Sequence, residues 1–109
     1  MLRRTDRFVE LIGRQLDLLQ SDEAELFTEA EEAEAVWNAA GRDDAEEAYG
    51  DFQLVVDAIG DRLLATRDTY AATLSPDAID EYRASFNRAA ARRFRRFPTI
   101  VADLDDGDV

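Results

Sequence analysis

The stretch Ser75–Pro98 reads SPDAIDEYRASFNRAAARRFRRFP, and it carries the clearest helix signal in the chain. Serine is a favoured N-cap, proline suits the first helical position, and an acid in the first turn complements the helix dipole. Because a proline cannot continue a helix, Pro98 marks the end, and we expect a helix over about 76–97. The apolar residues recur on one helix face: Ile79, Tyr82, Phe86, Ala89, Ala90, Phe94 and Phe97.

Two further long helices are expected upstream, at about 5–40 and 43–74. The apolar spacing is helical on both sides of Gly41, and glycine is common just after a helix end. The apolar phase of the first segment continues across Ser21, which favours a single helix. Ser21 is also a good N-cap, so a break near it, which would give four helices, is the alternative.

The predicted fold is all-α, because no stretch alternates apolar and polar residues as a half-buried strand does. A chain of 109 residues suits one domain. We therefore predict a small antiparallel helical bundle of three long helices over residues 1–98, followed by an acidic C-terminal tail over 99–109. Ile100, Val101 and Leu104 are the tail residues that are apolar enough to pack.

The chain lacks several of the side chains that enzymes use most often for catalysis. The chain has no cysteine and no histidine, which excludes disulfides and thiolate nucleophiles and removes the commonest general base. It also lacks a glycine-rich phosphate loop and the Gly-x-Ser-x-Gly motif. We therefore expect no enzymatic activity, no cofactor and no bound metal. A carboxylate site for Mg²⁺ or Ca²⁺ on Glu25, Glu29 and Glu32 is the metal alternative, and a solvated acidic face is favoured over it.

We expect a cytoplasmic protein with no membrane partner. The sequence has no run of about 18 apolar residues. The N-terminal MLRRTDRFVELIGRQ has charged residues where a secretory signal has its apolar core. All 13 basic residues are arginine, and the formal net charge is -12. A halophilic cytoplasm and a GC-rich genome are two explanations of that composition, and the sequence leaves both open.

Positive charge gathers on the last predicted helix. Residues 83–97 contain six arginines and no acid, whereas residues 15–82 carry a net charge of -16. A helical wheel divides the six arginines by the direction in which they face. Three lie opposite the apolar stripe (Arg88, Arg92 and Arg95), Arg96 lies to one side, and Arg83 and Arg93 lie on or beside the stripe.

The favoured interpretation of this cluster is that it neutralises an acidic helix of its own chain or of a second copy. In an up-down-up bundle the cluster lies level with Glu25, Glu29 and Glu32, which we expect to be its salt-bridge partners. Arg93 is the best-placed arginine for such a pair, because its forked guanidinium suits a carboxylate at a helix interface.

The alternative interpretation is a polyanion-binding face. In that case the three outward arginines contact the backbone of DNA or RNA, and Phe94 or Phe97 stacks on the bases. The acidic remainder of the chain repels polyanions, which makes this alternative less favoured.

A three-helix bundle with a short third helix leaves one end of the longer pair uncovered. That end contains Val36, Trp37, Tyr49 and Leu54, and an exposed apolar patch usually marks an interface. We expect a homodimer that covers these residues, and we expect Trp37→Ala to change the oligomeric state.

The function that these observations favour is that of a non-catalytic, acidic helical interaction module: an adaptor, a regulator or an assembly subunit that acts as a homodimer. Two alternatives remain. One is a nucleic-acid-binding protein that uses the arginine face. The other is an acidic protein that mimics nucleic acid and occupies a basic partner.

Overall fold

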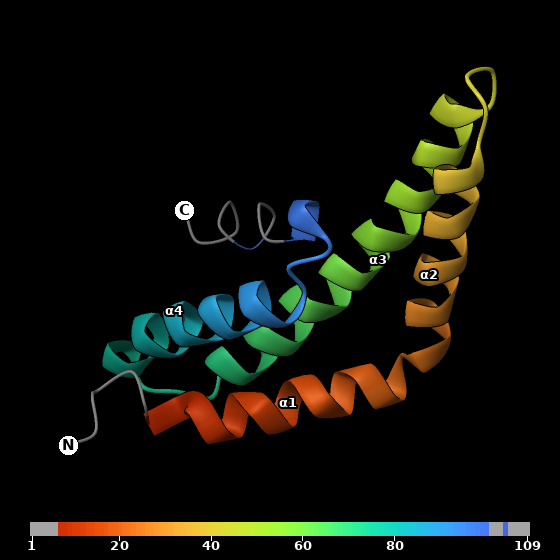
Figure 1. Cartoon of the computed structure of the whole chain (residues 1–109). Helices are drawn as coiled ribbons and strands as arrows, with labels where there is room; N and C mark the ends of the chain where they lie inside the picture. The colour runs from red at the N-terminus through yellow and green to blue at the C-terminus, as the bar shows by residue number, and fades with distance from the viewer. Residues whose placement is uncertain (1–6, 101–103, 105–109) are drawn as a thin grey trace.

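The structure, a computed structural model, describes residues 7–100 and Leu104. Every regular element within these residues is helical, which confirms the all-α prediction. Four long helices follow one another (Figure 1), and a short helical turn follows at 98–100. The predicted start of the first helix at Thr5 lies outside the described residues. The long helices are α1 (Val9–Asp22), α2 (Ala24–Ala39), α3 (Ala45–Ala71) and α4 (Pro76–Arg93).

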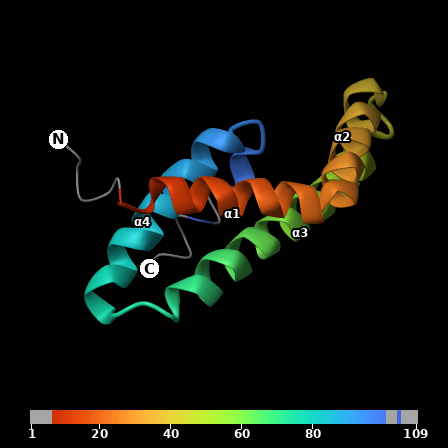
Figure 2. The ribbon, with the colours of Figure 1, turned by 90° about the horizontal axis from the view of Figure 1, so that it is seen from below.

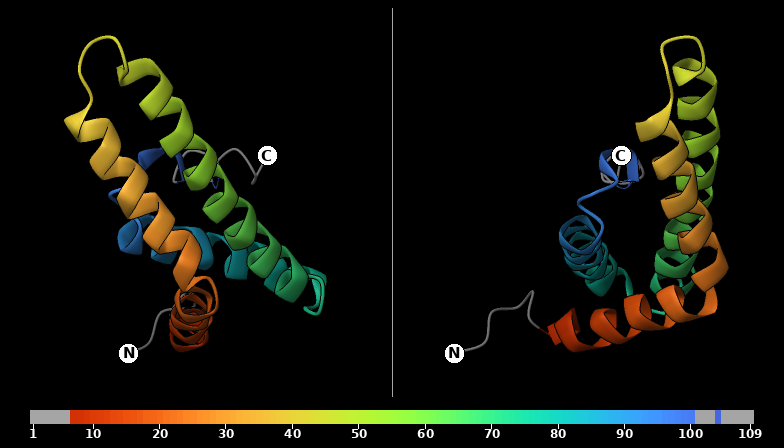
Figure 3. Two further views of the ribbon diagram at one scale, coloured as in Figure 1. Left: turned by 90° about the vertical axis from the view of Figure 1, so that its right-hand side faces the viewer. Right: turned by 45° about the vertical axis from the view of Figure 1, so that its right-hand side comes forward.

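The first predicted helix is broken at Glu23, so the prediction of one helix over 5–40 is wrong and the four-helix alternative is confirmed. Glu23 has φ -108° and ψ 30°, and no side chain caps the start of α2. Figure 3 shows α1 turning away from α2 at this point. Tertiary packing explains the break, because a straight helix could not cover both α3 along its first half and α4. The Glu23 carboxylate also lies 3.2 Å from Arg62 of α3.

The helices form an asymmetric bundle. α2 and α3 make an antiparallel hairpin that packs more extensively than any other pair of helices. The hairpin turn lies between Ala40, which is extended, and Asp44, and it projects away from α1 and α4 (Figure 1). α4 packs across α1 and the second half of α3, as the view from below shows (Figure 2). One end of the hairpin is therefore left without a covering helix.

The core lies where α1, α3 and α4 meet. Ile12, Leu16, Ile59, Leu63 and Phe86 are among its fully buried members. These residues recur every three or four positions along their helices, so the apolar periodicity of the sequence translates directly into this core.

α4 begins at Pro76 as predicted but ends at Arg93, earlier than the predicted residue 97. Phe94 leaves helical geometry, and the turn that follows directs two aromatic rings inward. The Phe94 ring stacks on Phe27 at 5.5 Å, and the Phe97 ring lies 6.1 Å from Phe52. Packing of these rings on the α2–α3 hairpin thus replaces the last turn of the expected helix.

Part of the predicted acidic tail belongs to the core. Ile100 and Leu104 are fully buried, so the bundle extends beyond the predicted boundary at residue 98. Val101 and the other tail residues at 102–103 and 105–109 lie outside the described residues. Apolar burial explains the extension, because both side chains belong to the hydrophobic core cluster.

Candidate functional site

Two arginines near the C-terminal end of α4 bind acidic residues of other helices. Arg93 donates hydrogen bonds to Asp17 (2.6 Å) and Gln20 (3.0 Å), both on α1. Arg96 forms an ion pair with Glu34 of α2. These contacts lie on the side of α4 that faces the rest of the protein, and they fix α4 relative to α1 and α2.

A second set of arginines lies on the outer side of α4 and of the turn that follows it. We call Arg88, Arg92 and Arg95 the arginine ridge. All three are exposed, as the helical wheel predicted. None of them has an ion pair or a hydrogen bond with another residue in the described part of the chain. The cluster therefore divides into arginines that hold the fold together and arginines that face solvent.

The expected acidic partners do not pair with the cluster. Glu25, Glu29 and Glu32 lie on an exposed flank of α2, which we call the glutamate ridge. Across residues 7–100 and 104, these three carboxylates form no ion pair. The cluster meets other acids instead: Arg93 pairs with Asp17 of α1, and Arg96 pairs with Glu34, which lies on α2 outside the glutamate ridge. The break at Glu23 changes the direction of α2 relative to α1, so partners chosen for one straight helix no longer apply.

Three of the four predicted interface residues, Val36, Tyr49 and Leu54, are exposed, and Trp37 is partly buried. The Trp37 ring is partly buried, stacked on Phe52 at 5.5 Å and edge-on to Tyr49 at 4.8 Å. Val36 is 62 % exposed beside Ala48, on one flank of the hairpin. The Tyr49 hydroxyl donates a hydrogen bond to Gln53, which in turn donates one to Thr99. Leu54, also on α3, is 70 % exposed. An interface at these residues remains a prediction.

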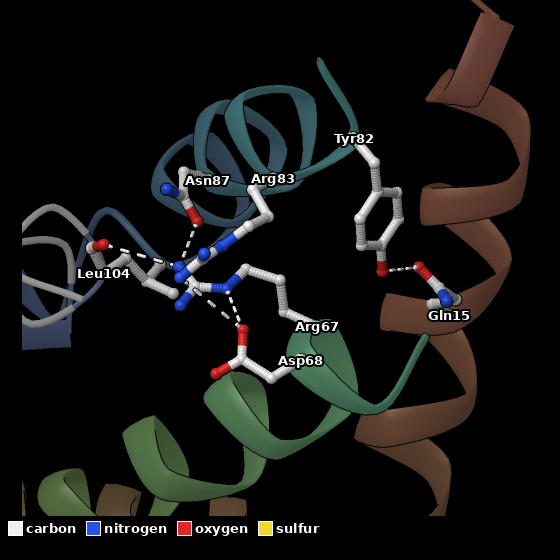
Figure 4. A network of polar contacts seen from close by, with 7 residues as sticks. All are labelled: Gln15, Arg67, Asp68, Tyr82, Arg83, Asn87 and Leu104. Carbon is white, nitrogen blue, oxygen red and sulfur yellow. Dashed lines mark hydrogen bonds and ion pairs between the residues drawn. The ribbon is translucent and has the colours of Figure 1, made fainter. Parts of the chain in front are cut away.

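Sequence reasoning missed a buried polar network around Arg67 of α3 (Figure 4). The Arg67 side chain is 1 % exposed and donates hydrogen bonds to Asp68 (2.9 Å), to Asn87 of α4 (3.0 Å) and to the Leu104 carbonyl (3.5 Å). Arg83 approaches the same Asp68 carboxylate at 3.8 Å. The network joins α3, α4 and the C-terminal segment. The helical position of Arg67 could have indicated this burial, because Arg67 follows Leu63 by one helical turn and so lies on the apolar stripe.

Tyr82 makes a second buried polar contact. Its hydroxyl donates a hydrogen bond of 2.8 Å to Gln15 of α1 (Figure 4). Its ring packs against Phe8 and Tyr70. Burial raises the pKa of Tyr82 to about 12, although the bond to Gln15 acts in the opposite direction. The phenol is therefore neutral at physiological pH, and its hydroxyl links α4 to Gln15 of α1.

Two open hollows lie beside α1. One, of about 330 Å³, adjoins the arginine ridge and is lined by Val9, Gly13, Leu16, Ala89, Arg92 and Arg93. Val9 is 52 % exposed, and a Cβ atom on Gly13 would meet nothing within 4 Å. The other, of about 510 Å³, lies between α1 and α3 and includes Leu18 and Tyr70. The first hollow places apolar surface next to the guanidinium of Arg92.

The described residues contain no group of three or more acidic side chains that could hold a metal ion. In particular, the glutamate ridge does not converge on a point. Over the same residues, no helix combines the length and the apolar character needed to cross a bilayer. Comparison of the chain with protein families, with curated proteins and with solved structures gave no match.

Proposed function

We propose that the protein is a non-catalytic interaction module that docks a carboxylate-rich helix of a protein partner onto the arginine ridge. One observation carries this proposal. Arg88, Arg92 and Arg95 are exposed and unpaired among the described residues, whereas their neighbours Arg93 and Arg96 are bound to acids of the same chain. A chain that needed these arginines only for its own charge balance would pair them in the same way.

The ridge is presented on a firmly held helix. The inner face of α4 buries Tyr82, Phe86 and Ala90 in the core, and Arg93 anchors the end of the helix to α1. Arg88 and Arg92 lie one helical turn apart, about 6 Å along α4, and Arg95 lies in the turn that follows the helix. A surface whose backbone is already ordered loses little further entropy on binding, which favours affinity.

A protein partner fits the ridge better than single-stranded nucleic acid does. Base stacking was expected from Phe94 and Phe97, but both rings are about 3 % exposed and pack in the core. Without them the ridge offers guanidinium groups alone, which bind carboxylates in forked geometry. The net charge of -12 also opposes a long polyanion more strongly than a short acidic helix.

Nucleic acid remains the second candidate, because unpaired guanidinium groups also bind phosphates. Its signature is a steep fall of affinity with salt, with each phosphate contact adding to the slope. The ridge is the surface used in either case, so the same variants test both candidates.

Fluorescence anisotropy separates these candidates. The probes are a labelled alanine-rich helical peptide of about 20 residues with glutamates at i, i+4 and i+7, and labelled single-stranded and duplex DNA. At about 0.15 M salt we expect the peptide to bind. We expect Arg88→Gln/Arg92→Gln/Arg95→Gln to weaken that binding at least about tenfold.

A control variant removes three exposed arginines elsewhere: Arg14→Gln/Arg42→Gln/Arg62→Gln. It lowers the charge equally and should leave peptide binding unchanged. Binding of DNA but not of the peptide would replace the proposal with the nucleic-acid candidate. No binding of either probe, even at low salt, would show that the arginine ridge is not a docking surface.

A further inference from the structure

We infer that the acidic helix received by the arginine ridge is α2 of a second copy of this chain. The inference rests on the proposed function and names its partner. Along the sequence, the glutamate ridge of α2 has the same i, i+4, i+7 spacing as the arginine ridge and the opposite charge; Arg88 and Arg92 lie on α4, and Arg95 lies in the turn that follows it. Both ridges are exposed, and both lack an ion pair within the described part of the chain. Each copy thus carries one surface and its complement.

The two ridges do not pair within one molecule. On its inner side, the end of α4 already binds α1 and α2 through Arg93 and Arg96. The ridge arginines are exposed, and Arg92 borders the hollow between α1 and α4 without an ion pair in the described part of the chain. Beyond the break at Glu23, α2 runs along α3. A glutamate ridge therefore reaches the arginine ridge only from a neighbouring molecule. When the arginine ridge of each copy binds the glutamate ridge of the other, the two reciprocal contacts form a closed two-fold dimer.

Apolar surface accompanies each ridge. Val36 follows Glu32 by one helical turn on α2 and is 62 % exposed. The open hollow with Val9 and Gly13 lies beside Arg92. Exposed ion pairs alone stabilise a complex weakly, so burial of these apolar groups supplies the remaining driving force. At physiological salt the screening length is about 8 Å, so the facing ridges outweigh the repulsion between distant acidic surfaces.

Charge reversal tests the inference by sedimentation equilibrium at physiological salt. The first variant is Arg88→Glu/Arg92→Glu/Arg95→Glu, and the second is Glu25→Arg/Glu29→Arg/Glu32→Arg. We expect the unmodified protein to be a dimer and each variant alone to be a monomer. An equimolar mixture of the two variants should regain the dimer mass, because each reversed ridge then meets its complement in the other chain.

Two controls accompany the reversals. Arg14→Glu/Arg42→Glu/Arg62→Glu adds as many negative charges as the first variant but leaves both ridges intact, and it should stay dimeric. Glutamine in place of the three ridge arginines should also give a monomer, which keeps the test decisive if a reversed variant does not fold. Helix content from circular dichroism identifies a variant that is unfolded.

A monomeric unmodified protein, or reversal variants that dimerise as it does, would overturn the inference. A mixture that stays monomeric would overturn it as well. These outcomes are separate from failure of the proposed function, which the acidic-peptide titration measures. If the unmodified protein is monomeric but binds the peptide through the arginine ridge, the inference fails and the proposed function stands. If it is monomeric and the peptide does not bind either, both fail.

Discussion

Arg93 donates a hydrogen bond of 2.6 Å from Nη1 to Oδ1 of Asp17, although 76 residues separate them along the chain. This contact sets the position of α4 beside α1. It also shows why the arginine cluster has two roles, since Arg93 belongs to the fold while Arg92, its neighbour in sequence, lies on the exposed ridge. The direction in which each guanidinium faces, and not the local density of positive charge, decides which role it takes.

The Arg93–Asp17 pair should contribute modestly to stability. Both side chains retain contact with water, and exposed pairs usually contribute about 0.5–1 kcal/mol. A double-mutant cycle with Arg93→Ala and Asp17→Ala, measured by urea denaturation, should give a coupling energy in this range. A coupling energy near zero would mean that the pair does not hold α4 on α1.

Arg67→Ala should be far more destabilising. The substitution removes the donor that satisfies Asn87 and leaves a buried gap between α3, α4 and Leu104. We expect the free energy of unfolding to fall by about 2–4 kcal/mol. Arg62→Ala, at an exposed position paired with Glu23, is the matched control and should cost less than about 1 kcal/mol. Equal losses for the two variants would contradict the role assigned to the network.

Tyr82 predicts a loss of stability at alkaline pH. Burial raises its pKa from 10.0 to about 12. Between these values the unfolded chain releases the phenol proton while the folded protein retains it. The free energy of unfolding therefore keeps its full value below pH 10. It falls by up to about 3 kcal/mol as the pH rises towards 12.

Urea denaturation between pH 9 and pH 12 measures this effect. Tyr82→Phe should lack the decline attributed to this residue, because the variant has no proton to release. A variant that loses stability as steeply as the unmodified protein would assign the alkaline sensitivity to other groups.

Gly50→Ala should stabilise the protein. Gly50 lies in the interior of α3, where a Cβ atom would meet nothing within 4 Å. Alanine is favoured over glycine in a helix by about 1 kcal/mol. Thermal denaturation should show a higher midpoint, whereas an unchanged or lower midpoint would indicate a contact at this position that the structure does not contain.

Much of the fold could be predicted because its signals are local. Ser75 occupies the N-cap position of α4 and Pro76 begins the helix, although the Ser75 side chain makes no capping hydrogen bond. Gly41 lies at the hairpin turn. The stripe containing Tyr82 and Phe86 is the buried face of α4. The exposure of Arg88 and Arg92 followed from the same periodicity, since a helical wheel depends only on residue spacing. Arg95 is exposed as well, but it lies beyond the end of α4, where the wheel no longer applies.

The remaining features depend on contacts between helices, which residue spacing does not contain. The break at Glu23 has neither proline nor glycine, and it exists because α1 and α2 pack on different neighbours. Burial of Arg67 required Asn87 and Leu104 to meet it from other segments. The pairing of Arg93 with Asp17 instead of a residue of the glutamate ridge follows from the same break, because an unbroken helix was used to predict the partners.

The most direct test of the central claim is an NMR titration of ¹⁵N-labelled protein with the glutamate-bearing helical peptide. Side-chain Nε–H signals report each arginine separately. If the peptide docks on the arginine ridge, the signals of Arg88, Arg92 and Arg95 shift on binding while that of the buried Arg67 does not. Shifts confined to the hairpin end, around Val36 and the Trp37 indole, would contradict docking on the arginine ridge and would place the docking surface on the hairpin.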